Sequence, residues 1–352
     1  MNDHSLAFLK RLLATPGPSG DEVAVGRIWR REAETFADQV YADVRGSSYA
    51  VLEGGAPRVL LAGHIDEIGV MVSAIDDDGF LWFSPIGGWD PQVLVGQRVR
   101  LAGRTGDVIG VIGKKPIHQM KPDEREKASK IEDLWIDIGV TSRAEARELV
   151  RVGATGVIDA PIYDLPGGRI VSRSIDDRIG AFTVLEALRL LERDRPRATV
   201  AAVATSQEEI TFAGAHTAAF SFEPQVAIAV DVTFATDHPN ADRRQYGNVR
   251  LGGGPVLSRG SANSPVVYDM LTAIAEREGI PYSVQVNPRF TGTDADAIHL
   301  SRGGVATAVI SIPNRYMHSP NEMIALSDVE YAARLIAAFV RSLTPETSFI
   351  PI

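Results

Sequence analysis

Several apolar segments of this 352-residue chain are followed at once by histidine or acidic residues. The run Val59–Gly63 ends at His64, and Asp66 comes two residues later. A second apolar run, "ATVAAVATS", is followed by the adjacent acids Glu208 and Glu209. Groups of this kind are costly to bury unless they are paired or bind a metal. The pattern therefore indicates either surface turns or a metal site at the ends of buried strands.

Further candidate groups occur in the second half of the chain. Asp231 follows the apolar run "VAIAV", His318 follows "VATAVISIP", and Asp176 and Asp177 open a helical stretch. Taken singly, each has a structural explanation, because acids cap helices and a histidine is often at the surface. Ligands of open α/β sheets, however, collect at the carboxyl ends of the strands. Carboxylates gathered at one such edge would repel each other, and a metal removes that repulsion.

The donor types narrow the choice of metal. The chain has no cysteine, which excludes thiolate ligands and disulfides, so a metal must be held by imidazoles and carboxylates. Such donors suit zinc, cobalt or manganese. Two imidazoles and three carboxylates, one of them shared, could hold two divalent ions that polarise a carbonyl and activate a bridging hydroxide. One glutamate of the adjacent pair would stay free as a general base, and Asp66 could fix the tautomer of His64.

The elements that must position these groups show two different sequence patterns. Helical spacing over 5–14 and 21–35 is followed by strand-like runs, and after about residue 166 apolar strands alternate with helices. This pattern predicts an α/β fold with a mixed, mostly parallel sheet that has helices on both faces. Between these parts, 68–165 consists of short β-type segments separated by Gly, Asp and Pro. We therefore expect a discontinuous catalytic domain, 1–67 and 166–352, with an inserted β-rich domain.

Composition excludes several classes of partner. Hydrophobic residues make up 45% of the chain and charged residues 23%, as in ordinary globular proteins, and the net charge is −9. This acidic balance argues against nucleic acid or an anionic membrane as a partner. No apolar stretch is long enough to span a membrane. The N-terminus has no signal-peptide pattern, so we expect a cytoplasmic location.

Longer motifs over nearly the whole chain carry a resemblance to a known family. The sequence resembles the co-catalytic metal aminopeptidases of the glutamyl aminopeptidase and cellulase M group, also called tetrahedral or TET peptidases. The matching stretches include "GHIDEIGVMV", "IGGWDPQVLVGQRV", "SRSIDDRIG", "TSQEEITFAGA", "AIAVDVTFATDHP", "TGTDADAIHLSRGG" and "IPNRYMHSPNEM". Two stretches depart from the usual pattern: "ITFAGA" follows the Glu pair, and "TGTDADAI" carries an extra acid, Asp296. These departures leave the preference for a substrate side chain open.

The resemblance implies a role for each candidate residue. The implied metal ligands are His64, Asp176 and Asp231 for one ion, and Asp176, Glu209 and His318 for the other. It also implies that Glu208 is the catalytic base, that Asp66 is the partner of His64, and that the Asp176–Asp177 peptide is cis. The implied activity is removal of single N-terminal amino acids from short peptides. The implied assembly is a homododecamer built from dimers through the inserted, PDZ-like unit.

Other functions remain as alternatives. A co-catalytic metal carboxypeptidase or N-acyl deacylase would need a basic pocket, for which Arg289 and Arg315 are candidates. A glycosidase needs two free carboxyl groups beside the scissile bond, and the metals would leave few. A PDZ-like binding module leaves the clustered ligands unexplained.

Two further expectations concern groups outside the ligand set. Aromatic residues of the inserted unit form either an interface between subunits or the unit's own core; they are Trp82, Phe83, Trp89 and Trp135. Acids beyond those that the ions need would favour a substrate with a free amine. They are Asp66, Glu67, Asp177, Asp237, Asp294 and Asp296.

Overall fold

An eight-stranded sheet forms the centre of the protein in the computed structural model, which describes all 352 residues. Its strands lie in the order β1 (Gln39–Ala42), β2 (Ser48–Leu52), β12 (Ala198–Thr205), β3 (Gly55–His64), β13 (Val226–Phe234), β16 (Ala306–Asn314), β14 (Val256–Gly260) and β15 (Ser283–Asn287). The central strands β12, β3, β13 and β16 run parallel, whereas β1, β2 and β14 join the sheet through antiparallel pairs. The predicted mixed, mostly parallel sheet is confirmed.

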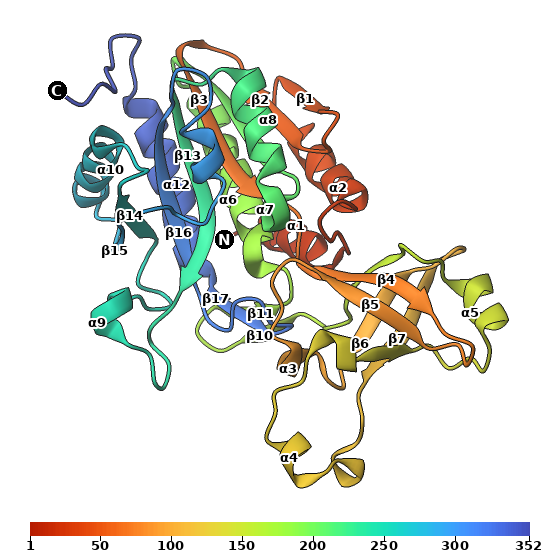
Figure 1. Ribbon diagram of the computed structural model, residues 1–352. Helices are drawn as coiled ribbons and strands as arrows, with labels where there is room; N and C mark the ends of the chain where they lie inside the picture. The colour runs from red at the N-terminus through yellow and green to blue at the C-terminus, as the bar shows by residue number, and fades with distance from the viewer.

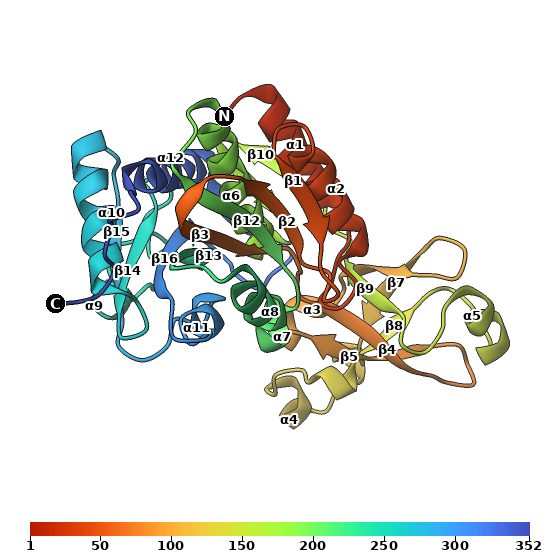
Figure 2. The same ribbon diagram turned by 90° about the horizontal axis from the view of Figure 1, so that it is seen from above.

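Helices cover both faces of this sheet (Figures 1 and 2). One face carries α1 (Asp3–Ala14), α2 (Val23–Ala33), α6 (Ile175–Arg193), α10 (Pro265–Glu278) and α12 (Leu326–Ser342). The other face carries α8 (Ala213–Phe222) and α11 (Ala295–Ile298). Because side chains alternate along a strand, Leu61 packs towards the first group of helices and Leu60 towards the second. Burial on both faces explains why the central strands read as continuous apolar runs.

Close packing brings the start of α6 against the end of β3. A Cβ atom on Gly63 would lie 2.4 Å from the backbone carbon of Gly180, so only glycine permits this approach. The peptide bond between Asp176 and Asp177, in the first turn of α6, is cis. The contact places Asp176 beside His64, the residue that ends β3.

A closed six-stranded barrel follows β3 and lies beside the main sheet (Figure 1). Its strands, in order around the barrel, are β4 (Gly69–Ile75), β5 (Leu81–Ile86), β8 (Trp135–Asp137), β7 (Asp107–Gly113), β6 (Arg98–Ala102) and β9 (Thr155–Ile158). The short helices α3 (Pro91–Leu94), α4 (Pro122–Arg125) and α5 (Arg143–Leu149) lie in its connections. An inserted β-rich unit is therefore present, as expected, while the boundaries at 68 and 165 remain a prediction.

The aromatic residues of the barrel divide between its core and its surface. Phe83 is 5% exposed and belongs to the barrel core, and Trp89 packs against that core. Trp82 is 36% exposed, and its ring centroid lies 6.4 Å from that of Trp135. Of the two alternatives, the unit's own core holds for Phe83 and Trp89, while Trp82 stays available for an interface.

The remaining elements are a small sheet and two short helices. A three-stranded sheet consists of β10 (Tyr163–Leu165), β11 (Arg169–Ser172) and β17 (Glu322–Ala325). The short helices α7 (Glu208–Thr211) and α9 (Arg243–Tyr246) follow β12 and β13. None of the helices is both long enough and apolar enough to cross a membrane.

Candidate metal centre and substrate cavity

Five segments bring histidine and carboxylate side chains to one edge of the main sheet. His64 ends β3, Glu209 lies in α7 just after β12, and His318 follows β16. Asp176 lies in the first turn of α6. Asp231 lies inside β13, which continues to Phe234. The parallel order of β12, β3, β13 and β16 accounts for the convergence, because their carboxyl ends meet at one edge.

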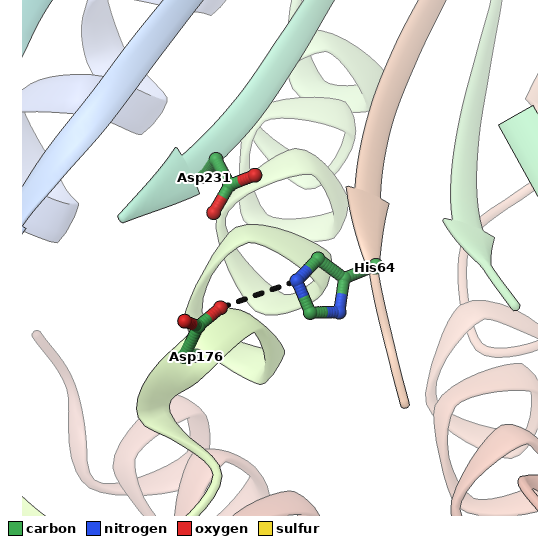
Figure 3. Close-up of side chains that lie close together, drawn as sticks. All are labelled: His64, Asp176 and Asp231. Atoms are coloured by element: carbon green, nitrogen blue, oxygen red, sulfur yellow. Dashed lines mark ion pairs between the residues drawn. The ribbon is translucent and has the colours of Figure 1, made fainter. Parts of the chain in front are cut away.

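Asp176 lies between the two imidazoles. Its Oδ1 atom is 3.2 Å from Nε2 of His64, and its Oδ2 atom is 3.3 Å from Nε2 of His318. The possible ligand atoms of His64, Asp176 and Asp231 all lie within 4.8 Å of one another, and so do those of Asp176, Glu209 and His318. Figure 3 shows the first group, with Asp231 and Asp176 facing the ring of His64. One carboxylate thus belongs to both groups.

The second nitrogen of each imidazole faces a backbone carbonyl. Nδ1 of His64 lies 3.2 Å from the carbonyl oxygen of Asp66 and 3.4 Å from its Oδ1 atom. Nδ1 of His318 lies 2.7 Å from the carbonyl oxygen of Gly88, in the barrel loop after β5. Because a carbonyl can only accept, each ring donates through Nδ1. Nε2 of both rings is then directed at Asp176, where it could bind an ion.

The electrostatics of the cluster fit a divalent cation. Burial, and then the charge of Asp176, raise the pKa of Asp231 well above its usual value. Burial lowers the pKa of His318, but Asp176 and Glu209 outweigh it and raise the value to about 11. The buried Oε1 atom of Glu209 has no hydrogen-bond partner. The raised pKa values of Asp231 and His318 both reflect acidic groups that lack a compensating cation. Together with the unpaired oxygen of Glu209, they indicate a site for positive charge.

Glu208 lies beside both groups without belonging to either. Its side chain is 8% exposed, and its Oε2 atom is 3.7 Å from Nε2 of His64. Burial, followed by the charge of Asp231, raises the pKa of Glu208 well above its usual value, although His64 opposes the shift. The backbone N–H groups of Glu208 and Glu209 donate to Asp66, at 3.1 and 3.3 Å. Asp66 therefore contacts both the turn of the glutamate pair and a candidate ligand.

Two of the acids expected as surplus negative charge are paired with arginines. Glu67 is 2% exposed and forms buried ion pairs with Arg173 and with Arg178, the latter at 2.6 Å. Asp237 pairs with Arg315 at 2.8 Å. Their charge is neutralised within the protein, so these two acids do not add to the surplus of negative charge expected from the sequence.

Three other acids hold the backbone or a hydroxyl group. Asp177 accepts N–H groups from α6 and from His64, at 3.0 and 3.2 Å. Asp296 accepts N–H groups of the loop that precedes it, at 2.8 Å. Asp294 accepts the hydroxyl of Thr205. These contacts give the three carboxylates a structural role.

Two acids near the cluster were missed in the sequence. Glu322, four residues after His318, accepts the backbone N–H groups of Asp176 and His318, both at 3.0 Å. Glu22 accepts the N–H of Gln207 at 3.2 Å, and burial raises its pKa to about 7. The "HSPNE" spacing could have indicated Glu322. No local pattern indicates Glu22, because its contact joins segments 185 residues apart.

A cavity of about 590 Å³ opens onto the cluster. Apart from the clustered acids and histidines, its lining has no charged side chain. Arg315 is paired with Asp237, and Arg289 is exposed and does not line the cavity. The basic pocket required by a carboxypeptidase is therefore absent from this cavity.

Known proteins are similar to this chain in both sequence and fold. Residues 46–335 match the M42 glutamyl aminopeptidase family. The lysyl aminopeptidase of Pyrococcus furiosus is 37% identical over 344 residues, which cover 96% of this chain and 97% of that protein. The crystal structure of a TET aminopeptidase from a marine sediment archaeon of the Thaumarchaeota has a TM-score of 0.93 at 37% identity and covers 97% of both chains.

A further solved structure adds an observation on assembly. The TET1 peptidase of Pyrococcus horikoshii can assemble into a tetrahedron or a large octahedral shell. It has a TM-score of 0.86 at 32% identity, over 96% of this chain and 100% of that one. The family match and these relatives agree with the resemblance found in the sequence motifs. The present chain belongs to the M42 glutamyl aminopeptidase family, and it is a peptide hydrolase of the aminopeptidase type.

Proposed function

We propose that this chain is a two-metal aminopeptidase that removes single N-terminal amino acids from short peptides. The observation that carries the proposal is the position of Asp176, whose two oxygens each lie beside one imidazole. A carboxylate that faces two groups of ligands is suited to bridge two cations. Two-metal sites of this kind are used by hydrolases, aminopeptidases among them.

The two ions would be held by ligand sets that share one member. The sets are His64, Asp176 and Asp231 for the first ion, and Asp176, Glu209 and His318 for the second. Imidazole and carboxylate donors without thiolates suit zinc, and they also accept cobalt or manganese. When bound, such ions supply Lewis-acid polarisation of a carbonyl and a lower pKa for water.

Glu208 acts as the general base. Its carboxyl group lies next to the ligands without being one of them, and burial raises its pKa well above the usual value. Two bound cations would favour the ionised form of Glu208, and a carboxylate whose pKa is raised by burial is basic enough to take a proton from the attacking water and pass it to the leaving amine. Asp66 contacts the backbone N–H of Glu208 and the ring of His64. It therefore fixes the position of the base relative to the ligands.

A free amine suits the cavity better than a carboxylate. The lining carries the acidic cluster and has no lysine or arginine. With two cations bound to the proposed ligands, Glu208 would be the one free acid of the lining; its charge attracts an ammonium group, and no side chain there could pair with a carboxylate, which disfavours the carboxypeptidase alternative. We expect the substrate to be held by its N-terminus, with the first peptide bond next to Glu208.

A peptide and its N-acetylated twin provide the test. The zinc-loaded enzyme should release single residues in order from the free peptide, followed by mass spectrometry. Acetylation should remove most of the rate, because a lost charged contact in a buried site costs several kcal/mol. Equal rates on the two peptides would support the N-acyl deacylase alternative, and internal fragments appearing first would point to an endopeptidase.

Self-association through the barrel completes the proposal, with twelve subunits built from dimers as the expected form. The barrel strands β5 and β7, on either side of β8, carry exposed apolar side chains. Trp82, Ile109 and Val111 are 36%, 45% and 47% exposed. Exposed apolar patches of this kind mark interaction sites. Light scattering should find a homo-oligomer, and Ile109→Glu should give smaller species; a fully active wild-type monomer would contradict the proposal.

A further inference from the structure

The part of the cavity beyond the cluster is lined by large apolar side chains that remain exposed. Ile210, Phe234, Tyr246 and Phe290 are 50%, 56%, 42% and 71% exposed, and all four line the cavity. They come from separate segments of the chain, namely α7, the end of β13, α9 and the loop after β15. Apolar side chains that surround one cavity without covering each other form a surface for an apolar ligand.

The polar groups among these residues are uncharged. Gln285 Oε1 accepts the hydroxyl of Thr233 at 2.7 Å, and Asn287 Nδ2 donates to Ser258 Oγ at 2.7 Å. The extra acid of the sequence, Asp296, does not line the cavity, and its carboxylate is occupied by the backbone of its own loop. We call these apolar and uncharged polar side chains beyond the cluster the cavity wall. This wall has no charged group that could pair with a substrate side chain.

We infer that the enzyme selects peptides whose first residue has an uncharged aliphatic or aromatic side chain, and that it discriminates against Lys, Arg, Asp and Glu at this position. The inference rests on the proposed aminopeptidase function and names its substrate class. A charged side chain placed against Phe234 and Phe290 would lose hydration without gaining a partner, which is costly. An apolar side chain gains from the same burial. This preference differs from those in the names of the lysyl relative and of the glutamyl family.

Steady-state rates on amino-acyl anilides test the inference directly. The zinc-loaded wild-type enzyme is compared on the Leu, Phe, Lys and Glu p-nitroanilides. We expect kcat/KM for Leu or Phe to exceed the values for Lys and Glu by about tenfold or more. A higher value for Lys or Glu would overturn the inference and leave the aminopeptidase proposal intact. No cleavage of any of the four would instead overturn the proposed function, and the inference with it.

A single substitution tests whether the cavity wall determines the selectivity for the first side chain of the substrate. Gln285→Glu keeps the shape and the acceptor for Thr233 but adds a negative charge to the cavity. The ratio of kcat/KM for Lys over Leu should rise by about tenfold. Val286→Glu is the matched control, because Val286 is the next residue on β15, is 71% exposed and does not line the cavity.

The control should leave the ratio unchanged. An unchanged ratio in Gln285→Glu, with circular dichroism and zinc content as in the wild type, would overturn the assignment of the wall. An equal rise in both variants would do the same, because it would show a general effect of surface charge.

Discussion

Asp66 accepts the backbone N–H of Glu208 through the same oxygen, Oδ1, that lies 3.4 Å from Nδ1 of His64. The Asp66 carboxylate is fully buried, and its Oδ2 atom accepts the hydroxyl of Ser19 at 2.6 Å. One buried group thus fixes the backbone of the proposed base and the ring of a proposed ligand. The position of each depends on the other through this contact.

Replacing Asp66 with Asn should therefore affect metal binding and turnover together. Asparagine keeps one acceptor oxygen, so its NH2 group opposes the N–H of either Glu208 or Glu209, which donate to different oxygens of Asp66. We expect a loss of about 10–100-fold in metal affinity or kcat, the usual effect of removing a group that orients a ligand. Zinc titration and steady-state kinetics provide the measurement. Ser19→Ala keeps the carboxylate and should have a smaller effect; a normal zinc affinity together with a normal kcat in Asp66→Asn would show that its contacts are dispensable.

Glu208 and Glu209 should respond differently to the same substitution. Glu208→Gln should keep both metals and lower kcat by about 100-fold or more, because general base catalysis typically contributes 10²–10⁴-fold. Glu209→Gln should instead lower the metal content. The exposed Glu223, 61% accessible in a surface pair with Arg302, provides the control substitution Glu223→Gln. Loss of metal in Glu208→Gln, together with normal turnover in Glu209→Gln, would contradict this assignment of base and ligand.

The convergence of the candidate ligands could be predicted from the sequence because His64, Glu209 and His318 end or follow apolar strands and Asp231 lies near the end of one. Parallel strands end at one edge, so a pattern read along the chain also predicts convergence in space. The partners of the other acids could not be predicted in this way. Glu67 meets Arg173 and Arg178, which lie 106 and 111 residues further along the chain, and no local pattern joins them. The same holds for Phe83, whose inward orientation depends on how the barrel closes.

Glu67→Gln tests the structural assignment of this acid. The substitution leaves two buried arginines without a counter-charge, and breaking a buried pair typically costs about 3–5 kcal/mol. Urea unfolding should show this loss in the free energy of unfolding. Asp38→Asn is a matched control, because its pair with Arg195 is partly exposed and should contribute no more than about 1 kcal/mol. A Glu67→Gln variant as stable as the control would mean that the buried pairs do not stabilise the fold.

Glu22 gives the stability a predictable dependence on pH. Burial raises its pKa from 4.5 to about 7, so the folded state retains a proton that the unfolded state loses. Its contribution to stability is fully present below about pH 4.5 and is lost as the pH rises through about 7. Glutamine mimics the protonated form and keeps an acceptor for the N–H of Gln207. Glu22→Gln should therefore gain up to about 3 kcal/mol over the wild type at about pH 8, and little at about pH 4.5.

Urea unfolding in the presence of a chelator, at the two pH values, measures this difference. A gain that is equal at both pH values would show that Glu22 does not titrate in this range. A loss at both would show that the substitution disturbs the contact with Gln207 for another reason.

Metal removal should destabilise the protein more at alkaline pH. Burial, and then the charge of Asp176, raise the pKa of Asp231, so without an ion its contribution to stability is lost as the pH rises through its folded-state pKa. Asp176 and Glu209 outweigh burial and raise the pKa of His318 to about 11, which acts in the same direction. A bound cation takes the place of these protons, so binding should release protons to the buffer.

Thermal unfolding with a chelator and with zinc, at about pH 6 and about pH 8, measures the effect. The rise in Tm on adding zinc should be larger at the higher pH, and activity lost on chelation should return with zinc, cobalt or manganese. Calorimetry in two buffers of different ionisation enthalpy counts the released protons. Asp231→Asn should release fewer, because the amide carries no titrating proton. Equal Tm shifts at both pH values, with no proton release, would show that the cluster does not exchange protons for a metal.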